Sequence, residues 1–275
     1  MAKEKRKLLN TIYFERCVGG NKNCPCHSVA LSKVKIFNFK AVLLAAKGLL
    51  VMRLVVRLGG SVIASPVNTE LLGKYADLIK TVKSQGHEVV VVVGGGALAR
   101  EFIRTAKELG LEMRAQDDVA ISVSRLFAQL FLKRLGEEAC GIVAVTLDDA
   151  AHCLSEGKIA VMGGLKPGIT TDAVAALVAE RVGADLLVKS TDQDGVYDKD
   201  PRKHADAVKL DKLSFEDLSK IFDEKVHKAG MHQIIDPEAV KVLKRHRVKL
   251  IVVNGFNPEN ILSAVKGEKV GTLIS

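Results

Sequence analysis

VVVVVGGGALAREF, at residues 89–102, is the stretch that decides the fold. Its five consecutive valines predict a strand that is buried on both faces, as the strands of parallel sheets are. Three glycines follow, and a helix is expected to begin at about Ala97. A strand that leads through glycine into a helix N-terminus presents unpaired N–H groups beside the positive end of the helix dipole, where phosphate binds. The stretch therefore predicts an α/β fold with an anion-binding turn.

A second turn of the same kind follows the strand-like run LVVRLGGSV at residues 54–62. Taken alone, either turn is equally well explained as an ordinary strand-to-helix connection. Two such turns in one chain suggest a site for two phosphorylated groups. Neither matches G-x-x-x-x-G-K-[ST], and neither has the G-x-G-x-x-G pattern with an acidic residue downstream. The sequence thus argues against a P-loop and against a dinucleotide-binding fingerprint.

From Met52 onward, strand-like apolar runs alternate with segments of helical periodicity, which predicts repeated β–α–β units. At 275 residues and 48% hydrophobic, the chain is long enough to bury a large core. We expect a three-layer αβα sandwich around a largely parallel sheet, as a single domain at 52–275 with halves at about 52–164 and 165–275. Strands are expected at about 53–58, 88–93, 142–146, 158–162, 185–189, 248–253 and 272–274; helices at about 68–85, 97–109, 117–135, 172–182, 214–228, 236–246 and 258–265, with a short helix before 158 and a loop at 59–61.

Residues 1–51 differ in composition from the rest of the chain. They hold ten of the 41 basic residues but only two of the 32 acidic ones, so they carry most of the formal net charge of +9. The nearly neutral remainder lacks the electrostatic footprint of a nucleic-acid-binding protein. Cys24, Cys26 and His27 are soft metal ligands, but no second cysteine pair completes a zinc site.

Two interpretations of residues 1–51 stay open. They form a basic leader without a fixed fold, or they lie outside the native protein and translation begins at Met52. The second hypothesis is motivated by Lys47 and Gly48, whose codons would form a purine-rich, ribosome-binding sequence just ahead of the Met52 codon. The mass of the protein from its native host distinguishes the two, because the full-length chain weighs 29.7 kDa.

The sequence also contains features that indicate the cellular compartment of the protein. No run reaches the roughly 18 apolar residues that a membrane-spanning helix needs. Cys140 and Cys153 are expected to be buried free thiols in a reducing environment. We therefore expect a cytoplasmic protein.

Two further segments carry candidate chemistry. VMGGLKPGITTDAVAALVAE, at 161–180, has more glycine and threonine than a capped strand-to-helix loop requires, although Thr171 or Asp172 is a possible helix cap. STDQDGVYDKDP, at 190–201, is rich in aspartate but lacks the glutamate of an EF-hand. It follows a strand, at the edge where open α/β sheets bind ligands, and Tyr197 offers a stacking face for a base.

RLGGSV, VVVGGGALAR, VMGGLKPGITTDAVAALVAE and STDQDGVYDKDP, in this order, resemble the amino-acid-kinase superfamily, and over 52–275 they are most similar to uridylate kinases of the archaeal type. The resemblance implies transfer of the γ-phosphoryl group of ATP to UMP, with Mg²⁺, in pyrimidine nucleotide biosynthesis. It also implies a cytoplasmic homo-oligomer, a homohexamer in which the first long helix forms a dimer face.

The resemblance assigns roles to individual residues. Arg57, Lys189 and Asp172 are expected to be catalytic, with Asp172 orienting the two cations, which neutralise the transferring phosphoryl group. Many relatives carry lysine where this chain has Arg57, and arginine is not a simple substitute, so the main cation is either Arg57 or Lys189. The residues expected at ATP are Gly60, Ser61, Gly96, Arg100, Thr191, Tyr197 and Asp200. Those expected at UMP are Gly95, Asp117, Leu165, Lys166, Pro167, Gly168, Ile169, Thr170 and Thr171, and no side chain is assigned to a metal.

Alternatives of three classes remain beside this interpretation: another kinase of the same fold, a storage protein and a nucleic-acid-binding regulator. An isopentenyl phosphate kinase is expected to have a histidine just after the glycine triplet, where this chain reads GGGALAREF, and an amino-acid kinase is the other enzyme of the same fold. A nucleotide-binding storage protein would not need Asp172, Lys189 and the complete loop at 165–171. A nucleic-acid-binding regulator is motivated only by the basic residues of 1–51.

Overall fold

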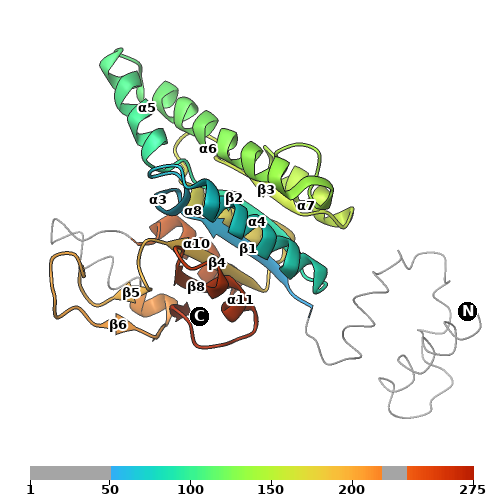
Figure 1. The fold of residues 1–275 in the computed structure, drawn as a ribbon. Helices are drawn as coiled ribbons and strands as arrows, with labels where there is room; N and C mark the ends of the chain where they lie inside the picture. Colours follow the sequence, from blue (N-terminus) through green and yellow to red (C-terminus); the bar gives the residue numbers. More distant parts are fainter. Residues whose placement is uncertain (1–50, 219–233) are drawn as a thin grey trace, which may run out of the picture. The chain divides into compact units, whose positions relative to one another are not determined.

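The computed structural model describes residues 51–218 and 234–275, and these form an α/β fold around a seven-stranded sheet (Figure 1). The strand order is β3-β2-β1-β4-β8-β9-β7, and neighbouring strands are parallel except for the antiparallel pair β8–β9. The strands are β1 (Arg53–Leu58), β2 (Glu88–Val93), β3 (Ala160–Met162), β4 (Leu186–Thr191), β7 (Lys212–Leu213), β8 (Lys249–Asn254) and β9 (Thr272–Ile274).

Helices cover both faces of the sheet, which confirms the expected three layers. α4 (Thr69–Ser84), α6 (Met113–Leu135) and α11 (Glu259–Val265) pack on one face. The other face is covered by α7 (Leu147–Ser155), α8 (Thr171–Val182) and α10 (Pro237–His246). α5 (Gly96–Glu108) lies alongside α6 (Figure 1). No helix in the described parts of the chain is long and apolar enough to cross a membrane.

The valine run forms β2 as predicted, and all five of its valines are fully buried. Val89, Val91 and Val93 contribute to the core on one face, while Val90 and Val92 contribute to the core on the other. Such a strand is possible only in the middle layer of three, because both of its faces must be covered by helices.

The strand order changes direction at β1. β2 and β3 extend on one side of β1, whereas β4 pairs with its other side. In open α/β sheets, ligands bind in the crevice outside the carboxyl ends of the strands at such a switch point. The register of β1 against β4 places Arg57 opposite Lys189, so two basic residues lie side by side where a ligand is expected.

Most predicted elements are confirmed, but residues 142–146 form no strand. Ala144 makes an isolated bridge to Met162, while Ile142 and Val145 are exposed. The run IVAVT is mostly apolar, but within it only Ala144 pairs with β3, and a single bridge does not extend into a ladder. The predicted loop at 59–61 is also wrong in part, because a short helix, α3, begins there (Gly60–Ile63).

Other differences concern the ends of elements and very short strands. α6 begins at Met113, ahead of the predicted start at 117. β7 and the separate two-stranded hairpin of β5 (Val196–Tyr197) and β6 (Lys209–Leu210) were not predicted, because two-residue strands show no periodicity. The predicted helix at 214–228 lies largely outside the described residues, as do residues 1–50 with their cysteines.

Cys140 and Cys153 are buried as expected, but the prediction of free thiols is wrong because a disulfide joins them. Cys153 lies in α7, which turns back toward β3, and the N–H of Cys140 donates to the carbonyl of Ile159 beside the same strand. This return brings the two Cα atoms to 5.9 Å, an ordinary separation for a disulfide.

The two glycine turns touch each other backbone to backbone. A Cβ on Gly60 would overlap the backbone N of Gly96 and lie 2.5 Å from its Cα, and a Cβ on Gly96 would overlap the carbonyl oxygen of Gly60. Gly96 also has φ +63°, which favours glycine. Only glycine at both positions allows the turns after β1 and β2 to meet.

We predict opposite effects for two glycine-to-alanine substitutions. Gly60→Ala forces backbone away from backbone, so it should lower the free energy of unfolding by about 1–3 kcal/mol or more. Gly73→Ala is the matched control, because Gly73 lies inside α4 and a Cβ at this position would have no atom within 4 Å, so the substitution should raise stability by about 0.5–1 kcal/mol. Denaturant unfolding of both variants tests this, and a Gly60→Ala protein as stable as the wild type would show that the turns do not constrain each other.

Candidate active site

Arg57 and Lys189 bring two positive charges to one face of the sheet. In a parallel pair, residues in register point to the same face, and Arg57 of β1 is in register with Lys189 of β4. Two residues earlier on the same face, Val55 and Leu187 belong to the hydrophobic core. The face therefore changes from aliphatic to cationic at the carboxyl ends of both strands, which is the ligand-binding edge.

Asp172, in the first turn of α8, lies between these two cations. Its Oδ1 is 2.7 Å from Arg57 Nε, an ion pair in which the two atoms are not aligned as a hydrogen bond. Its Oδ2 accepts from Lys189 Nζ, which also donates to the carbonyl of Ile234. Arg57 Nη2 in turn donates to Thr171 Oγ1 at 3.0 Å. Arg57, Asp172 and Lys189 are called the charge cluster below.

The electrostatics of the charge cluster follow from its burial. Burial alone would raise the pKa of Asp172, but the charges of Arg57 and Lys189 outweigh it and lower the pKa. Burial lowers the pKa of Lys189, and the like charge of Arg57 adds to this while Asp172 opposes it. With all three groups ionised, the cluster itself carries a net charge of +1, and the nearby Asp236 carboxylate offsets part of it at Lys189, so Arg57 is the cation better placed to bind an anion such as a phosphate.

The structure decides between two sequence interpretations of Asp172. The cap of α8 is Thr170, whose hydroxyl accepts from the N–H of Ala173 at 3.1 Å. The same hydroxyl donates to Asp236, which caps α10. The alternative that Thr171 or Asp172 caps the helix is therefore wrong, and the Asp172 carboxylate is engaged with the cations instead.

The loop of residues 163–170 between β3 and α8, called the β3–α8 loop, lies along α6. Asp117 Oδ2 of α6 accepts from the N–H of Gly168 at 2.8 Å. Ser124 Oγ accepts from the N–H of Gly164 at 2.7 Å. Arg125 donates to the carbonyls of Gly164 and Leu165, each at 2.9 Å. The loop that the sequence singled out thus has its backbone held by one helix.

On the other side of the switch point, the aspartate-rich segment after β4 holds its own shape. Asp200 is buried and accepts from the N–H of Arg202 at 3.0 Å, and Asp192 forms an ion pair with the Arg202 side chain. The Thr191 carbonyl accepts from the N–H of Gly255 at 2.7 Å. Tyr197 lies in β5, where burial and the nearby Asp194 raise its pKa. Among the described residues, no group of three His, Cys, Asp or Glu side chains is placed to hold a metal ion.

The structure thus brings some of the predicted site residues together and leaves others apart. Arg57, Thr171, Asp172 and Lys189 meet directly, and Gly60 meets Gly96. Gly95 packs close to Ser124 of α6, which also holds the β3–α8 loop. Arg100 and Lys166 are exposed, and in the described parts of the chain neither joins the charge cluster. The assignments of these residues to ATP and UMP remain predictions.

Tyr75, in α4, is a residue that the sequence analysis did not single out. It is fully buried, and its hydroxyl contacts Ser190 Oγ and the carbonyl of Gly255, each at 2.7 Å. Burial raises the pKa of Tyr75 to about 12, so the phenol stays protonated as a donor. It braces the segment after β8 against the end of β4, next to Lys189. A tyrosine on a buried helix face was itself a signal, since a buried phenol needs a polar partner.

Comparisons with known proteins agree with this fold and identify the family. A sequence model described as the amino acid kinase family matches residues 52–254. The uridylate kinase of Methanocaldococcus jannaschii is 43% identical over 225 residues, which are 81% of this chain and 99% of that protein. The crystal structure of uridylate kinase from Archaeoglobus fulgidus is similar with a TM-score of 0.74 at 41% identity, covering 82% of this chain and 100% of that one. A UMP kinase from Bacillus anthracis shares the fold, with a TM-score of 0.69 at 22% identity over 82% of this chain and 96% of its own.

We predict that Asp172 makes a large, pH-dependent contribution to stability. Because its folded-state pKa is lowered from 3.8, this contribution is fully present above that pH and is lost as the pH falls through the folded-state pKa. Asp172→Asn removes the carboxylate charge that Arg57 and Lys189 share, so the free energy of unfolding at neutral pH should fall by about 3–5 kcal/mol and then depend less on acid.

Asp148→Asn is the matched control for this measurement. Asp148 pairs with Arg181 on the surface, where its side chain is 80% exposed, so its loss should cost less than about 1 kcal/mol. Denaturant unfolding at neutral and acidic pH compares the two variants. Equal losses would contradict a special role for the charge cluster in stability.

Proposed function

The chain belongs to the amino acid kinase family, and we propose that it is a UMP kinase, which transfers the γ-phosphoryl group of ATP to UMP and releases UDP and ADP. The observation that carries this proposal is the charge cluster, with its surplus positive charge at the switch point of the sheet. It is supported by the names of the relatives that match at about 40% identity over nearly their whole length. We place the reaction in pyrimidine nucleotide biosynthesis in the cytoplasm.

The charge cluster suits phosphoryl transfer because a loose transition state needs alignment and charge neutralisation more than a covalent partner. The Arg57 guanidinium lies beside the first glycine turn, where its Nη1 would be 3.1 Å from a Cβ on Gly59. Lys189 is deeper, and both Asp172 and the Ile234 carbonyl take hydrogen bonds from it. This arrangement favours Arg57 as the cation that meets the transferring phosphoryl group, with Lys189 behind it. Asp172 orients both and is no base, because a nucleotide phosphate is already ionised.

We propose that the two nucleotides occupy opposite sides of the cluster. ATP is assigned to Gly60, Ser61, Gly96 and Arg100 for its phosphates and to Thr191, Tyr197 and Asp200 for its nucleoside. UMP is assigned to Gly95, Asp117 and residues 165–171. Mg²⁺ would be carried on the ATP phosphates, whose charge it neutralises, since both Asp172 oxygens already face cations.

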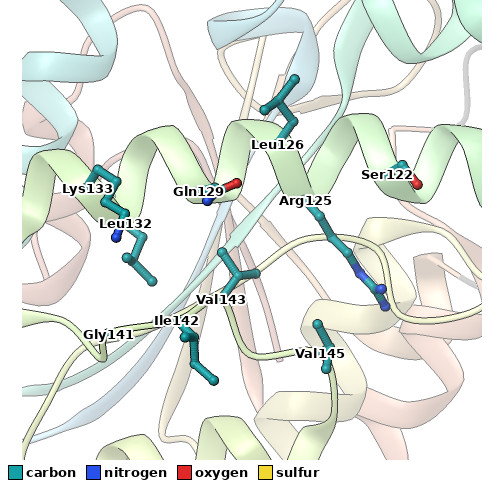
Figure 2. Close-up of a pocket in the computed structure, with 10 residues that line it drawn as sticks. All are labelled: Ser122, Arg125, Leu126, Gln129, Leu132, Lys133, Gly141, Ile142, Val143 and Val145. Atoms are coloured by element: carbon teal, nitrogen blue, oxygen red, sulfur yellow. The ribbon is translucent and has the colours of Figure 1, made fainter.

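We also propose that the protein is a homo-oligomer, a hexamer in which α6 provides a dimer contact. The support is a groove of about 550 Å³ between α6 and residues 141–145 (Figure 2). Leu126 and Leu130 of α6 and Ile142 across the groove are more than half exposed. A cluster of exposed large apolar side chains on one face is typical of an interface, and most soluble oligomers are symmetric assemblies of identical chains.

A coupled ADP-release assay tests the proposed activity. UMP, CMP, dUMP and isopentenyl phosphate are offered in turn with ATP and Mg²⁺. We expect UMP to give the highest kcat/KM and CMP a lower value. Equal or faster turnover of isopentenyl phosphate would reject the proposal in favour of another kinase of the same fold, and no turnover of any acceptor with tight nucleotide binding would favour a storage protein.

Two carboxylate variants should separate chemistry from binding. Asp172→Asn removes the charge that holds Arg57 and Lys189 in position, so kcat should fall by roughly 10²-fold or more with little change in KM for UMP. Asp117→Asn keeps an oxygen for the N–H of Gly168 but loses the charge, so KM for UMP should rise while kcat is spared. Both are measured below the melting temperature of the variant, and a kcat for folded Asp172→Asn like that of the wild type would show that its role is only structural.

The oligomer proposal predicts that a charge in the groove dissociates the assembly. Ile142→Asp places a carboxylate on a side chain that is 75% exposed in the single chain, where it would be buried between subunits. Val208→Asp is the control, because Val208 is 60% exposed in the segment before β6, away from α6. Light scattering should show a smaller mass for the first variant only. A monomeric wild type at micromolar concentration would overturn the proposal.

A further inference from the structure

Arg125, in the middle of α6, contacts the β3–α8 loop but has no role in the charge cluster. We infer that Arg125 is a positioning residue that sets the shape of this loop and thereby the affinity for the phosphoryl acceptor. The inference rests on the proposed function, which assigns UMP to residues 165–171. It concerns a side chain that neither touches the cluster nor stands in any of the four glycine- and aspartate-rich segments.

The two hydrogen bonds of Arg125 fix two successive peptides of the loop. Its Nε donates to the carbonyl of Gly164 and its Nη2 to the carbonyl of Leu165, each at 2.9 Å. The donors of a guanidinium are held in one rigid plane, so together they set the orientation of two successive carbonyls. Leu165 is the first loop residue assigned to UMP, and the two peptides that Arg125 fixes lie on either side of it.

The neighbouring Ser124 completes the hold on Gly164. Its Oγ accepts from the N–H of Gly164 at 2.7 Å and donates to the Ile121 carbonyl of its own helix at 2.8 Å. Gly163 allows this approach, because a Cβ there would lie 2.7 Å from the backbone N of Arg125. Both polar groups of the Gly164 backbone are therefore bound by consecutive residues of one helix.

The far end of the loop is held by the same helix. Asp117, two turns before Ser124, accepts from the N–H of Gly168. The loop is thus held at Gly164 and Leu165 on one side and at Gly168 on the other, with the exposed Lys166 between them. Because Asp117 is also assigned to UMP, α6 fixes the position of the loop relative to another residue that is expected to bind the same nucleotide. Arg125 holds one end of the loop in that position.

The surroundings of Arg125 separate positioning from stability. Figure 2 shows its side chain extending from α6 along the groove toward Val145, and the residue is half-buried and belongs to neither hydrophobic core. Removal of the guanidinium therefore takes no side chain out of either hydrophobic core. Loss of Arg125 should therefore release the loop with little effect on the rest of the fold.

Arg125→Lys and Arg125→Gln test the inference with steady-state kinetics of the full chain. An ammonium group is a single point charge and cannot bridge both carbonyls, so Lys should not rescue the arginine. We expect KM for UMP to rise about tenfold or more in both variants, with KM for ATP and kcat at saturating UMP within about threefold of the wild type. Arg134→Lys is the matched control: Arg134 lies on the same helix and pairs with Asp77 on the surface, and its variant should behave like the wild type.

Hydrogen exchange gives a second readout that does not depend on the acceptor. Arg125→Lys should speed exchange of amides in residues 163–170 but not in β1, and Arg134→Lys should change neither. Unchanged KM for UMP, equal rises in KM for UMP and ATP, unchanged exchange in the loop, or unfolding of both Arg125 variants would each overturn the inference. If the wild type does not phosphorylate UMP, the proposed function fails, while the exchange result still decides whether Arg125 holds the loop.

Discussion

The structure depends on one constraint: the half-buried Arg57 and the buried Lys189 lie side by side, and among the described residues Asp172 is the carboxylate that pairs with both. Two like charges in register on neighbouring strands repel each other, and both lose hydration on burial. Asp172 supplies the carboxylate from the first turn of α8. The chain between β3 and α8 must therefore bring the start of α8 to this point of the sheet. Thr170 then ties the start of α8 to the start of α10 through Asp236. Strand order, helix start and loop path are thus set by one charge balance.

Much of the fold could be predicted because its signals are local and periodic. The valine run, the glycine turns and the amphipathic α4 each appear within a dozen residues of sequence, and each is where it was expected. The errors arose where a distant partner decides the structure. Residues 142–146 are a strand-like apolar run that pairs with β3 only through Ala144, and Cys140 meets Cys153 only because α7 turns back toward β3.

The residues of the candidate site also fall into two groups: those that local sequence patterns reveal and those that depend on distant contacts. Its glycines, threonines and Asp172 stand in compact segments that sequence patterns and a family resemblance identify. The adjacency of Arg57 and Lys189 is a product of the β1–β4 register, which no local pattern contains. Ser124 and Arg125 were missed for a further reason: they look like ordinary helix residues until α6 lies along the β3–α8 loop. When a residue shapes a site from a neighbouring helix, its distance along the sequence from the site residues follows no recognisable pattern.

The contact between Gly60 and Gly96 has a consequence for how this site can change. The two peptide backbones already touch, so the turns after β1 and β2 are as near as backbone atoms permit. On the proposed function Gly60 and Gly96 both face the phosphates of ATP, so their separation sets the width of that phosphate site. Substitution can widen the site but cannot narrow it. Substitutions at these two glycines can therefore change the separation of the turns in one direction only, because in the present chain that separation is already at its minimum.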